Sequence, residues 1–221
     1  MVRGKIPPSS IVSYDIEPKH PMVKKTDDFL TENLSGLRNC VTLSNPPFGR
    51  ANKLSVPFFN KCAEVSDYIG FITPKSWRKW SVLNRLDTRF HLMHDEDLCV
   101  DYTTDGQGSK GKLNTIFQIY QKKDFTRDII KIEDRGYIVK TTPEHADVSL
   151  TIFGRGCGSL STDFPRQKNT TKMFLKVANS DVLNALKSVN YSRFYNNVAF
   201  VEALSIQEIN YLLNEYFDDL G

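Results

Sequence analysis

Hydrophobic residues in the first half of the chain form short runs that alternate with segments of helical periodicity. From Ser55 to Glu64, and again around Trp77 to Phe90, apolar side chains recur at the spacing of one helix face. Short apolar runs bounded by turn residues predict strands at 10–14, 41–43, 68–72, 91–94 and 114–120. This alternation predicts an α/β layer with a largely parallel sheet.

Beyond residue 125 the pattern indicates a smaller part of mixed strands and helices. Strands are expected at 129–132, 137–140, 149–153 and 172–177, with a short helix at 181–188. The segment from Ser205 to Phe217 predicts a helix, because Ser205 and Glu208 have the spacing of a capping box ahead of an apolar stripe. We therefore predict an α/β core over 1–125 and a C-terminal extension over 126–221, which packs on the core as a candidate target-recognition part.

Composition and charge exclude several classes of protein. The chain has 221 residues, 40% hydrophobic and 25% charged, as is usual for globular domains. We expect neither a membrane span nor a secretory signal, because no long apolar run and no apolar N-terminal core occur. The four cysteines form no Cys-x-x-Cys pair, which favours reduced thiols in a cytoplasmic protein over a metal site. The net charge of +3 is compatible with nucleic-acid binding without indicating it.

The most specific pattern is the tetrapeptide Asn45-Pro46-Pro47-Phe48, which directly follows the predicted strand 41–43. The exocyclic amine of adenine is a poor nucleophile, because its lone pair is delocalised into the ring. Catalysis therefore needs acceptors that hold both amine hydrogens, and the Asn45 side chain and the next carbonyl supply two. Pro46 and Pro47 fix the backbone, and Phe48 offers a face on which a flipped base stacks. The alternative is a Pro-rich turn between strand and helix.

With its flanking strands, the tetrapeptide gives residues 10–120 a resemblance to the class I S-adenosylmethionine-dependent methyltransferases, specifically the phage-type N6-adenine DNA methyltransferases. The strand ending in Phe71-Ile72-Thr73-Pro74 is similar to the one that follows the catalytic loop in that family. The resemblance is weaker from 149 to 221. It implies a Rossmann-like sheet with helices on both faces, incomplete at the N-terminus, plus a small C-terminal β/α extension. It also implies S-adenosyl-L-methionine as cofactor, DNA as partner and the cytoplasm of a bacterial or phage-infected cell.

The resemblance also implies which residues contact the cofactor. Asp15 ends the predicted strand 10–14 and matches the acid that binds the ribose hydroxyls, with Glu17 as a solvated neighbour. Asp28 matches the acid that binds the cofactor adenine, with Asp27 as the alternative. Phe29 matches the aromatic residue that packs on the adenine ring.

One element of the family pattern is missing, the strand and Gly-rich turn of the form Phe-x-Gly-x-Gly. It is expected about 20 residues before the ribose acid, yet only fourteen residues precede Asp15, with Gly4 as their single glycine. In that family the first strand lies between the second and the fourth, so its loss leaves unpaired edges in the sheet centre. Four explanations are open: a copy that packs differently, a strand supplied by a partner subunit or a homodimer, a rearranged order, or the C-terminal portion of a longer enzyme.

The rearranged order would place the cofactor turn at Gly154, Gly156 and Gly158, after the predicted strand 149–153. The segment that follows contains Pro165 and no helical stripe, so no helix N-terminus would face the cofactor. A glycine-rich β-turn is the favoured interpretation.

Basic and aromatic residues suggest where nucleic acid binds, with DNA favoured over RNA. Cations bind phosphate and aromatic rings stack on bases, and the candidates are Lys75, Trp77, Arg78, Lys79, Lys110 and Lys112. The alternative is a helix with core tryptophans and solvated cations, followed by a Gly-rich loop. Three functions are consistent with the sequence: N6-adenine DNA methylation, a catalytically inactive methyltransferase-like protein that binds nucleic acid or a partner, and RNA amino-group methylation.

Overall fold

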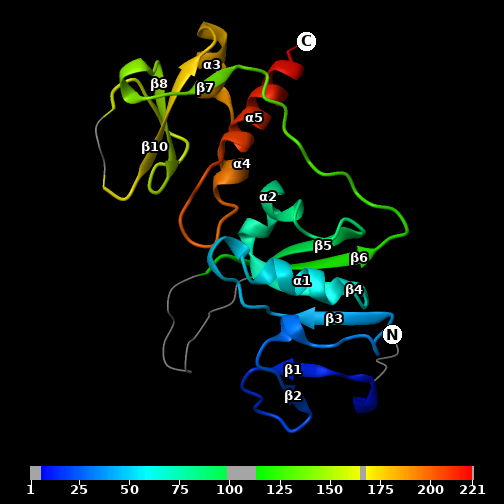
Figure 1. Cartoon of the computed structure of the whole chain (residues 1–221). Helices are drawn as coiled ribbons and strands as arrows, with labels where there is room; N and C mark the ends of the chain where they lie inside the picture. Colours follow the sequence, from blue (N-terminus) through cyan, green and yellow to red (C-terminus); the bar gives the residue numbers. More distant parts are fainter. Residues whose placement is uncertain (1–5, 99–112, 165–167, 221) are drawn as a thin grey trace.

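The computed structural model describes residues 6–98, 113–164 and 168–220. The described chain has an α/β first part and a smaller second part, each built on its own sheet (Figure 1). The sheet of the first part has the order β3-β4-β6-β5, made of β3 (Cys40–Ser44), β4 (Ser66–Pro74), β5 (Phe90–Leu98) and β6 (Thr115–Lys122). A separate parallel pair precedes it, β1 (Ser13–Asp15) and β2 (Val23–Lys25).

The four-stranded sheet is mixed. β3 runs parallel to β4, but β6 is antiparallel to both of its neighbours, β4 and β5. Since β5 is antiparallel to β6, the strands β3, β4 and β5 all run in one direction and β6 runs in the other. The prediction of a largely parallel sheet is confirmed for three of these four strands, but it missed the reversed strand β6, which lies between β4 and β5.

Two α-helices and four 3-10 turns connect these strands. They are η1 (Pro8–Ser10), η2 (Phe29–Thr31), η3 (Arg50–Asn52), α1 (Ser55–Ala63), η4 (Lys75–Arg78) and α2 (Trp80–Leu83). The helix predicted around Trp77 to Phe90 is reduced to η4 and the single turn of α2. Asn84 explains why it ends there, because its side chain exchanges two hydrogen bonds with the backbone of Ile130.

Phe59 of α1 lies at the centre of the first core. Its ring meets four other aromatic rings at centroid distances of 5.1 to 5.8 Å, those of Phe71, Trp77, Phe90 and Tyr120. The register pairs Phe71 with Gln118 and Ile69 with Tyr120, so these residues share one face of the sheet. Both α1 and α2 pack on this face. The expectation of helices on both faces is therefore not met in the described part of the chain.

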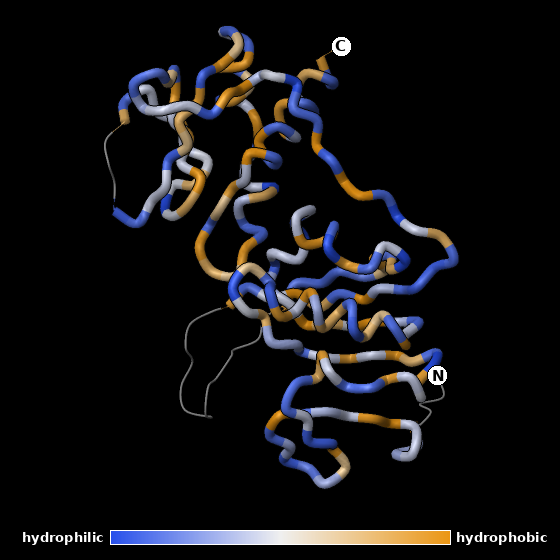
Figure 2. Tube along the Cα trace, in the orientation of Figure 1, coloured by the Kyte–Doolittle hydropathy of each residue, from blue (hydrophilic) through white to orange (hydrophobic). Residues whose placement is uncertain are grey.

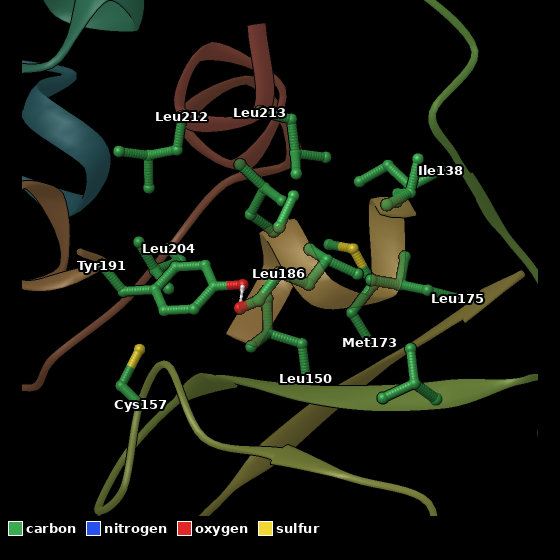
Figure 3. Packing of buried hydrophobic residues seen from close by; sticks show 14 residues of the cluster. Ile138, Leu150, Cys157, Met173, Leu175, Leu186, Tyr191, Leu204, Leu212 and Leu213 are labelled. Atoms are coloured by element: carbon green, nitrogen blue, oxygen red, sulfur yellow. Dashed lines mark hydrogen bonds between the residues drawn. The ribbon is translucent and has the colours of Figure 1, made fainter. Parts of the chain in front are cut away.

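The second part is an antiparallel sheet covered by helices. Its elements are β7 (Ile138–Lys140), η5 (Pro143–His145), β8 (Val148–Phe153), β9 (Leu160–Ser161), β10 (Thr171–Val177), α3 (Ser180–Ser188), α4 (Ser192–Tyr195) and α5 (Ile206–Asp218). The strand order is β7-β10-β8-β9. The capping box of Ser205 and Glu208 is confirmed at the start of α5. Figure 3 shows the core between sheet and helices, where the Tyr191 hydroxyl donates to the Leu186 carbonyl.

Two further predictions in this part have clear outcomes. The segment 129–132 forms no strand, since the Ile130 amide bonds to the Asn84 side chain instead of a neighbouring strand. The glycines Gly154, Gly156 and Gly158 form the turn between β8 and β9, with φ angles of 88°, 81° and 90°. The prediction of a glycine-rich β-turn is thus confirmed, and among the described residues no helix lies between this turn and β10, as a rearranged cofactor motif would require.

The second part docks on α2 through an aromatic contact and an ion pair. Trp80 lies 5.4 Å from the ring of Phe194 and 5.1 Å from that of Tyr211. The Lys79 ammonium lies 3.1 Å from the Glu208 carboxylate. The boundary predicted at 125/126 falls in the segment between β6 and β7, which Figure 1 shows as an extended connection.

Candidate functional site

The tetrapeptide lies where two parallel strands end. Asn45 directly follows β3 and Lys75 directly follows β4, so both lie at the same edge of the sheet. Asp15, the last residue of β1, is on this side of the molecule as well, since β1 and β3 end on the same side in Figure 1. In open α/β sheets the carboxyl ends of parallel strands are the usual place for a ligand.

The tetrapeptide exposes the polar side chain of Asn45 to solvent, and its two prolines fix the backbone. Pro46 is buried, Phe48 is half-buried, and Asn45 and Pro47 are exposed. Within the described residues, the Asn45 side chain makes no hydrogen bond to the protein. Its amide is therefore available to a substrate, while Pro46 anchors the loop.

The segment after the tetrapeptide is held in an uncommon backbone conformation. Gly49, Ala51 and Asn52 have positive φ angles of 65°, 54° and 58°. A Cβ atom at Gly49 would lie 2.9 Å from Cγ of Leu54, so this position favours glycine. The buried Asn52 donates from Nδ2 to the Ser76 hydroxyl at 3.0 Å, which ties the segment to η4. Such local strain is typical of positions where a fold holds a site in place.

Replacing Ala51 by glycine is expected to raise the free energy of unfolding by about 0.5 kcal/mol. The left-handed backbone costs an alanine about 1–2 kcal/mol, which exceeds the entropy cost of about 0.4–1 kcal/mol that glycine adds through the unfolded state. Urea unfolding would measure the change. Ala63→Gly, at the end of α1, should instead lose stability. A loss at both positions would contradict strain at Ala51.

The predicted cofactor residues lie at the turns after β1 and β2. Asp15 is exposed, accepts from the Glu17 amide at 2.8 Å and borders an open depression of about 510 Å³. Asp28 caps η2 by accepting from the Leu30 amide at 2.9 Å. Each carboxylate uses one oxygen in its own turn, and the other oxygen has no hydrogen-bond partner among the described residues. Both therefore retain an acceptor for a hydroxyl or amine.

Phe29 packs between strand β1 and helix α1. Its ring lies 5.8 Å from that of Tyr14 in β1 and 5.2 Å from that of Phe58 in α1. The residue is half-buried, so part of the ring is accessible. Asp15 and Asn45 thus follow strands that end on the same side of the molecule, and Phe29 packs between β1 and α1. No Gly-rich turn accompanies them in the described residues.

Trp77 does not stack on a base, and that prediction is wrong. Its side chain is 0% exposed and its indole nitrogen donates to the Ser55 hydroxyl at 3.2 Å. The 3-10 turn η4 directs Trp77 into the aromatic core around Phe59. The alternative interpretation, a core tryptophan, is the one that the structure supports.

The three predicted cations near Trp77 are engaged in ion pairs. Lys75 lies 2.5 Å from Asp97, Arg78 forms a bidentate pair with Asp95 and also contacts Asp97, and Lys79 is paired with Glu208. Their charge is neutralised within the protein, which weakens the case for phosphate binding at this place. Lys110 and Lys112 lie outside the described residues.

Sequence reasoning missed the residues that neutralise this cluster. Asp95 and Asp97 are two residues apart on β5, a spacing that puts both on one face of a strand. Behind them, the fully buried Gln118 donates to Asp95 at 2.7 Å and accepts from the Tyr120 hydroxyl at 2.9 Å. Only the spacing of Asp95 and Asp97 could have been read from the sequence, because their partners lie on η4 and β6, which only the fold brings beside β5.

The pKa values of both aspartates lie below their usual range. For Asp97 the hydrogen bond from Lys75 lowers the pKa, and Arg78 adds to the effect. For Asp95 partial burial raises the pKa, but the hydrogen bonds from Arg78 and Gln118 outweigh it. Because the pKa values of both aspartates are lower in the folded chain than in the unfolded chain, their ion pairs stabilise the fold. This stabilisation is fully present above the unfolded pKa of about 3.9 and is lost as the pH falls through the folded pKa values.

Replacing Arg78 by glutamine is therefore expected to lower the free energy of unfolding at pH 7 by about 1 kcal/mol, given the partial exposure of the pair. The difference from the unmodified chain should shrink as the pH is lowered from about 5 to 2, where the aspartates become protonated. Thermal unfolding across this pH range would measure it. Arg89→Gln, in the more exposed pair with Asp87, serves as control with a smaller effect. A difference that persists unchanged at pH 2 would contradict the ion-pair explanation.

The remaining chemistry of the described residues is limited. Burial raises the pKa of Cys62 to about 12 and that of Cys157 to about 11, so both remain thiols at neutral pH. Across 6–98, 113–164 and 168–220, no cluster of His, Cys, Asp and Glu could hold a metal ion. In the same ranges no helix is long and apolar enough to span a membrane. Comparison with protein-family models, curated proteins and solved structures finds no match to this chain.

Proposed function

We propose that this chain carries the catalytic loop of a methyltransferase that transfers a methyl group from S-adenosylmethionine to the N6 amine of adenine in DNA. The observation that carries the proposal is the exposed, unpartnered amide of Asn45 at the carboxyl end of β3. A surface asparagine in a simple turn would normally bond to its own backbone. Asn45 instead presents its amide from a loop fixed by buried Pro46.

The chemistry required by an adenine amine fits this loop. The Asn45 side-chain oxygen and the Pro46 carbonyl are two acceptors for the amine hydrogens, which favours the pyramidal nitrogen of the transition state. Phe48 is half-buried and offers part of its ring to a base that has left the helix stack. The methyl donor supplies the transferred carbon, while these residues orient the amine toward it.

The strand order supports a Rossmann-like arrangement. In class I methyltransferases the first strand lies between the second and the fourth. If β1 corresponds to the second strand and β3 to the fourth, the pairs β2-β1 and β3-β4 flank the place of the missing strand. In that arrangement Asp15 would hold the cofactor ribose, and Asp28 and Phe29 its adenine. The methionine part would still lack its Gly-rich turn.

A non-catalytic methyltransferase-like protein is the second candidate. It is favoured by the missing Gly-rich turn and by the ion pairs that neutralise Lys75, Arg78 and Lys79. Such a protein would keep the Asn45 loop as a binding surface and would not transfer a methyl group.

Calorimetry and a methyl-transfer assay distinguish the two candidates. Titration of S-adenosylmethionine is expected to give binding that Asp15→Ala weakens, with Asp67→Ala in β4 as a control. Labelled S-adenosylmethionine with adenine-containing duplex DNA should yield N6-methyladenine, and RNA of the same sequence tests the alternative substrate. Absence of both binding and transfer at millimolar cofactor, with and without candidate partner subunits, would favour the non-catalytic protein.

A further inference from the structure

Positive charge is concentrated in one segment of the second part. Residues 148–177, which run from the start of β8 to the end of β10, contain five Lys or Arg residues and one acidic residue, Asp163. Of the 29 Lys and Arg residues and the 26 Asp and Glu residues of the chain, this leaves 24 and 25 for all other positions. The net charge of +3 therefore arises from this segment, and the remainder of the chain is close to neutral.

Strand β10 places two of these lysines on the face of its sheet that is turned away from the core. Met173 and Leu175 point into the core beneath the helices. Alternation along the strand therefore puts Lys172, Phe174 and Lys176 on the opposite face. Lys176 is exposed and Lys172 is half-buried, and neither forms an ion pair among the described residues.

Two further cations lie at one end of this sheet. Arg155 is exposed in the glycine-rich turn between β8 and β9, and Lys168 is exposed in the segment before β10. The two segments touch, because a Cβ atom at Gly154 would lie 2.3 Å from the carbonyl oxygen of Asn169. Neither cation has an ion-pair partner within the described part of the chain. These charges thus differ from the cations near η4, which acidic residues neutralise.

Exposed aromatic residues belong to segments that contact the same turn. Phe153 is 42% exposed at the end of β8 and forms a β-bridge with Ala203. Phe200 is 66% exposed and lies three residues before Ala203. The Gly154 amide donates to the Glu202 carbonyl at 3.0 Å, which holds this segment against the turn. Figure 2 shows the segment between α4 and α5 as a hydrophobic stretch.

The segment that carries Phe200 also reaches the carboxyl edge of the first sheet. The Asn114 amide donates to the Ala199 carbonyl at 2.9 Å, and the Lys75 amide donates to the Asn114 carbonyl at 3.0 Å. Lys75 directly follows β4, which ends at the edge that carries Asn45. Figure 1 shows the segment between α4 and α5 extending from the second part to the first. Hydrogen bonds therefore link the basic end of the second part to the edge that holds the tetrapeptide.

We propose that one surface of the second part, the basic surface, binds the phosphate backbone of duplex DNA. It consists of Phe153, Arg155, Lys168, Lys172, Lys176 and Phe200. A cation without an internal partner can bind a phosphate without breaking an ion pair of the protein. Exposed phenylalanine side chains suit bases that have lost a stacking neighbour, as happens when one base is flipped out.

The choice of duplex DNA rests on the proposed function, whereas a site for a polyanion rests on the charge distribution alone. An acidic protein or an anionic membrane would also attract the cations. DNA is favoured because aromatic residues accompany the cations and because the surface is linked to the edge of Asn45. Binding is measurable without cofactor, so its failure is separable from failure of methyl transfer.

The test is fluorescence anisotropy of a short labelled DNA duplex across a range of salt concentrations. In Arg155→Gln and in Lys172→Gln, the slope of log affinity against log salt should fall by about 0.9, as expected for one lost phosphate contact. Affinity at 0.1 M salt should fall about fivefold or more by the same relation. Phe200→Ala should weaken binding about tenfold and leave the slope unchanged, because stacking releases no counterions.

Lys187→Gln is the matched control for the lost charge. Lys187 is exposed on α3, which covers the other face of the same sheet, so both affinity and slope should stay as in the unmodified chain. Thermal unfolding of each variant checks that the fold is kept.

Three results would overturn the proposal. The first is an unchanged slope in both Arg155→Gln and Lys172→Gln. The second is an equal loss in Lys187→Gln, which would show that DNA responds to net charge and to no particular surface. The third is tighter binding of an RNA duplex of the same sequence, or of phosphatidylserine vesicles, which would assign the surface to another partner. A chain that binds DNA through the basic surface and transfers no methyl group would instead disprove the proposed function alone.

Discussion

Replacing Asn45 by alanine is expected to lower the rate of methyl transfer to adenine by about 100-fold or more. Loss of one preorganised transition-state partner typically costs that much. Because the Asn45 side chain is exposed and makes no hydrogen bond within the described residues, the free energy of unfolding should stay within about 0.5 kcal/mol. An effect on rate without an effect on stability is the signature of a residue that contacts substrate.

The measurement uses labelled S-adenosylmethionine and an adenine-containing duplex. Asn196→Ala is the control, because Asn196 is also exposed and lies in the second part. Retention of full activity in Asn45→Ala would remove the tetrapeptide from the mechanism. A loss of activity that accompanies unfolding would point to a structural role instead.

Replacing Phe59 by alanine should produce the largest loss of stability in the first part, about 3–5 kcal/mol. Phe59 is 0% exposed and contacts four aromatic rings, so its removal leaves a cavity that rigid neighbours cannot fill. Urea unfolding followed by circular dichroism would measure the loss.

Phe58 provides a matched control on the same helix. It is half-buried and packs on Phe29, so Phe58→Ala should cost clearly less, about 1 kcal/mol. Equal losses at the two positions would mean that the aromatic cluster is not the centre of the core.

Local features of the sequence predicted the structure well. The helix α1 and the capping box of α5 depend on residues within one or two turns, and both form where they were expected. The tetrapeptide follows a strand as predicted, because the short apolar run 41–43 forms β3. Asp15 ends a strand as predicted and Asp28 precedes η2, while their role as cofactor ligands stays a prediction.

Features that depend on distant partners could not be predicted. The position of β6 between β4 and β5 is decided by pairing across the sheet. Whether Trp77 or Trp80 faces the aromatic core depends on the 3-10 turn η4, which replaces part of the expected helix. The partner of Lys79 is Glu208, 129 residues further along the chain. The sequence alone therefore could not show that Lys79 forms an ion pair.

The placement of the tryptophans gives this chain two built-in fluorescent reporters. The chain has two tryptophans: Trp77 lies within the aromatic core of the first part, and Trp80 lies against Phe194 and Tyr211 of the second. In Trp77→Phe, emission comes from Trp80 and shifts when the two parts separate. In Trp80→Phe, emission comes from Trp77 and shifts when the first core opens. The order of undocking and unfolding can thus be followed in solution without attaching a label.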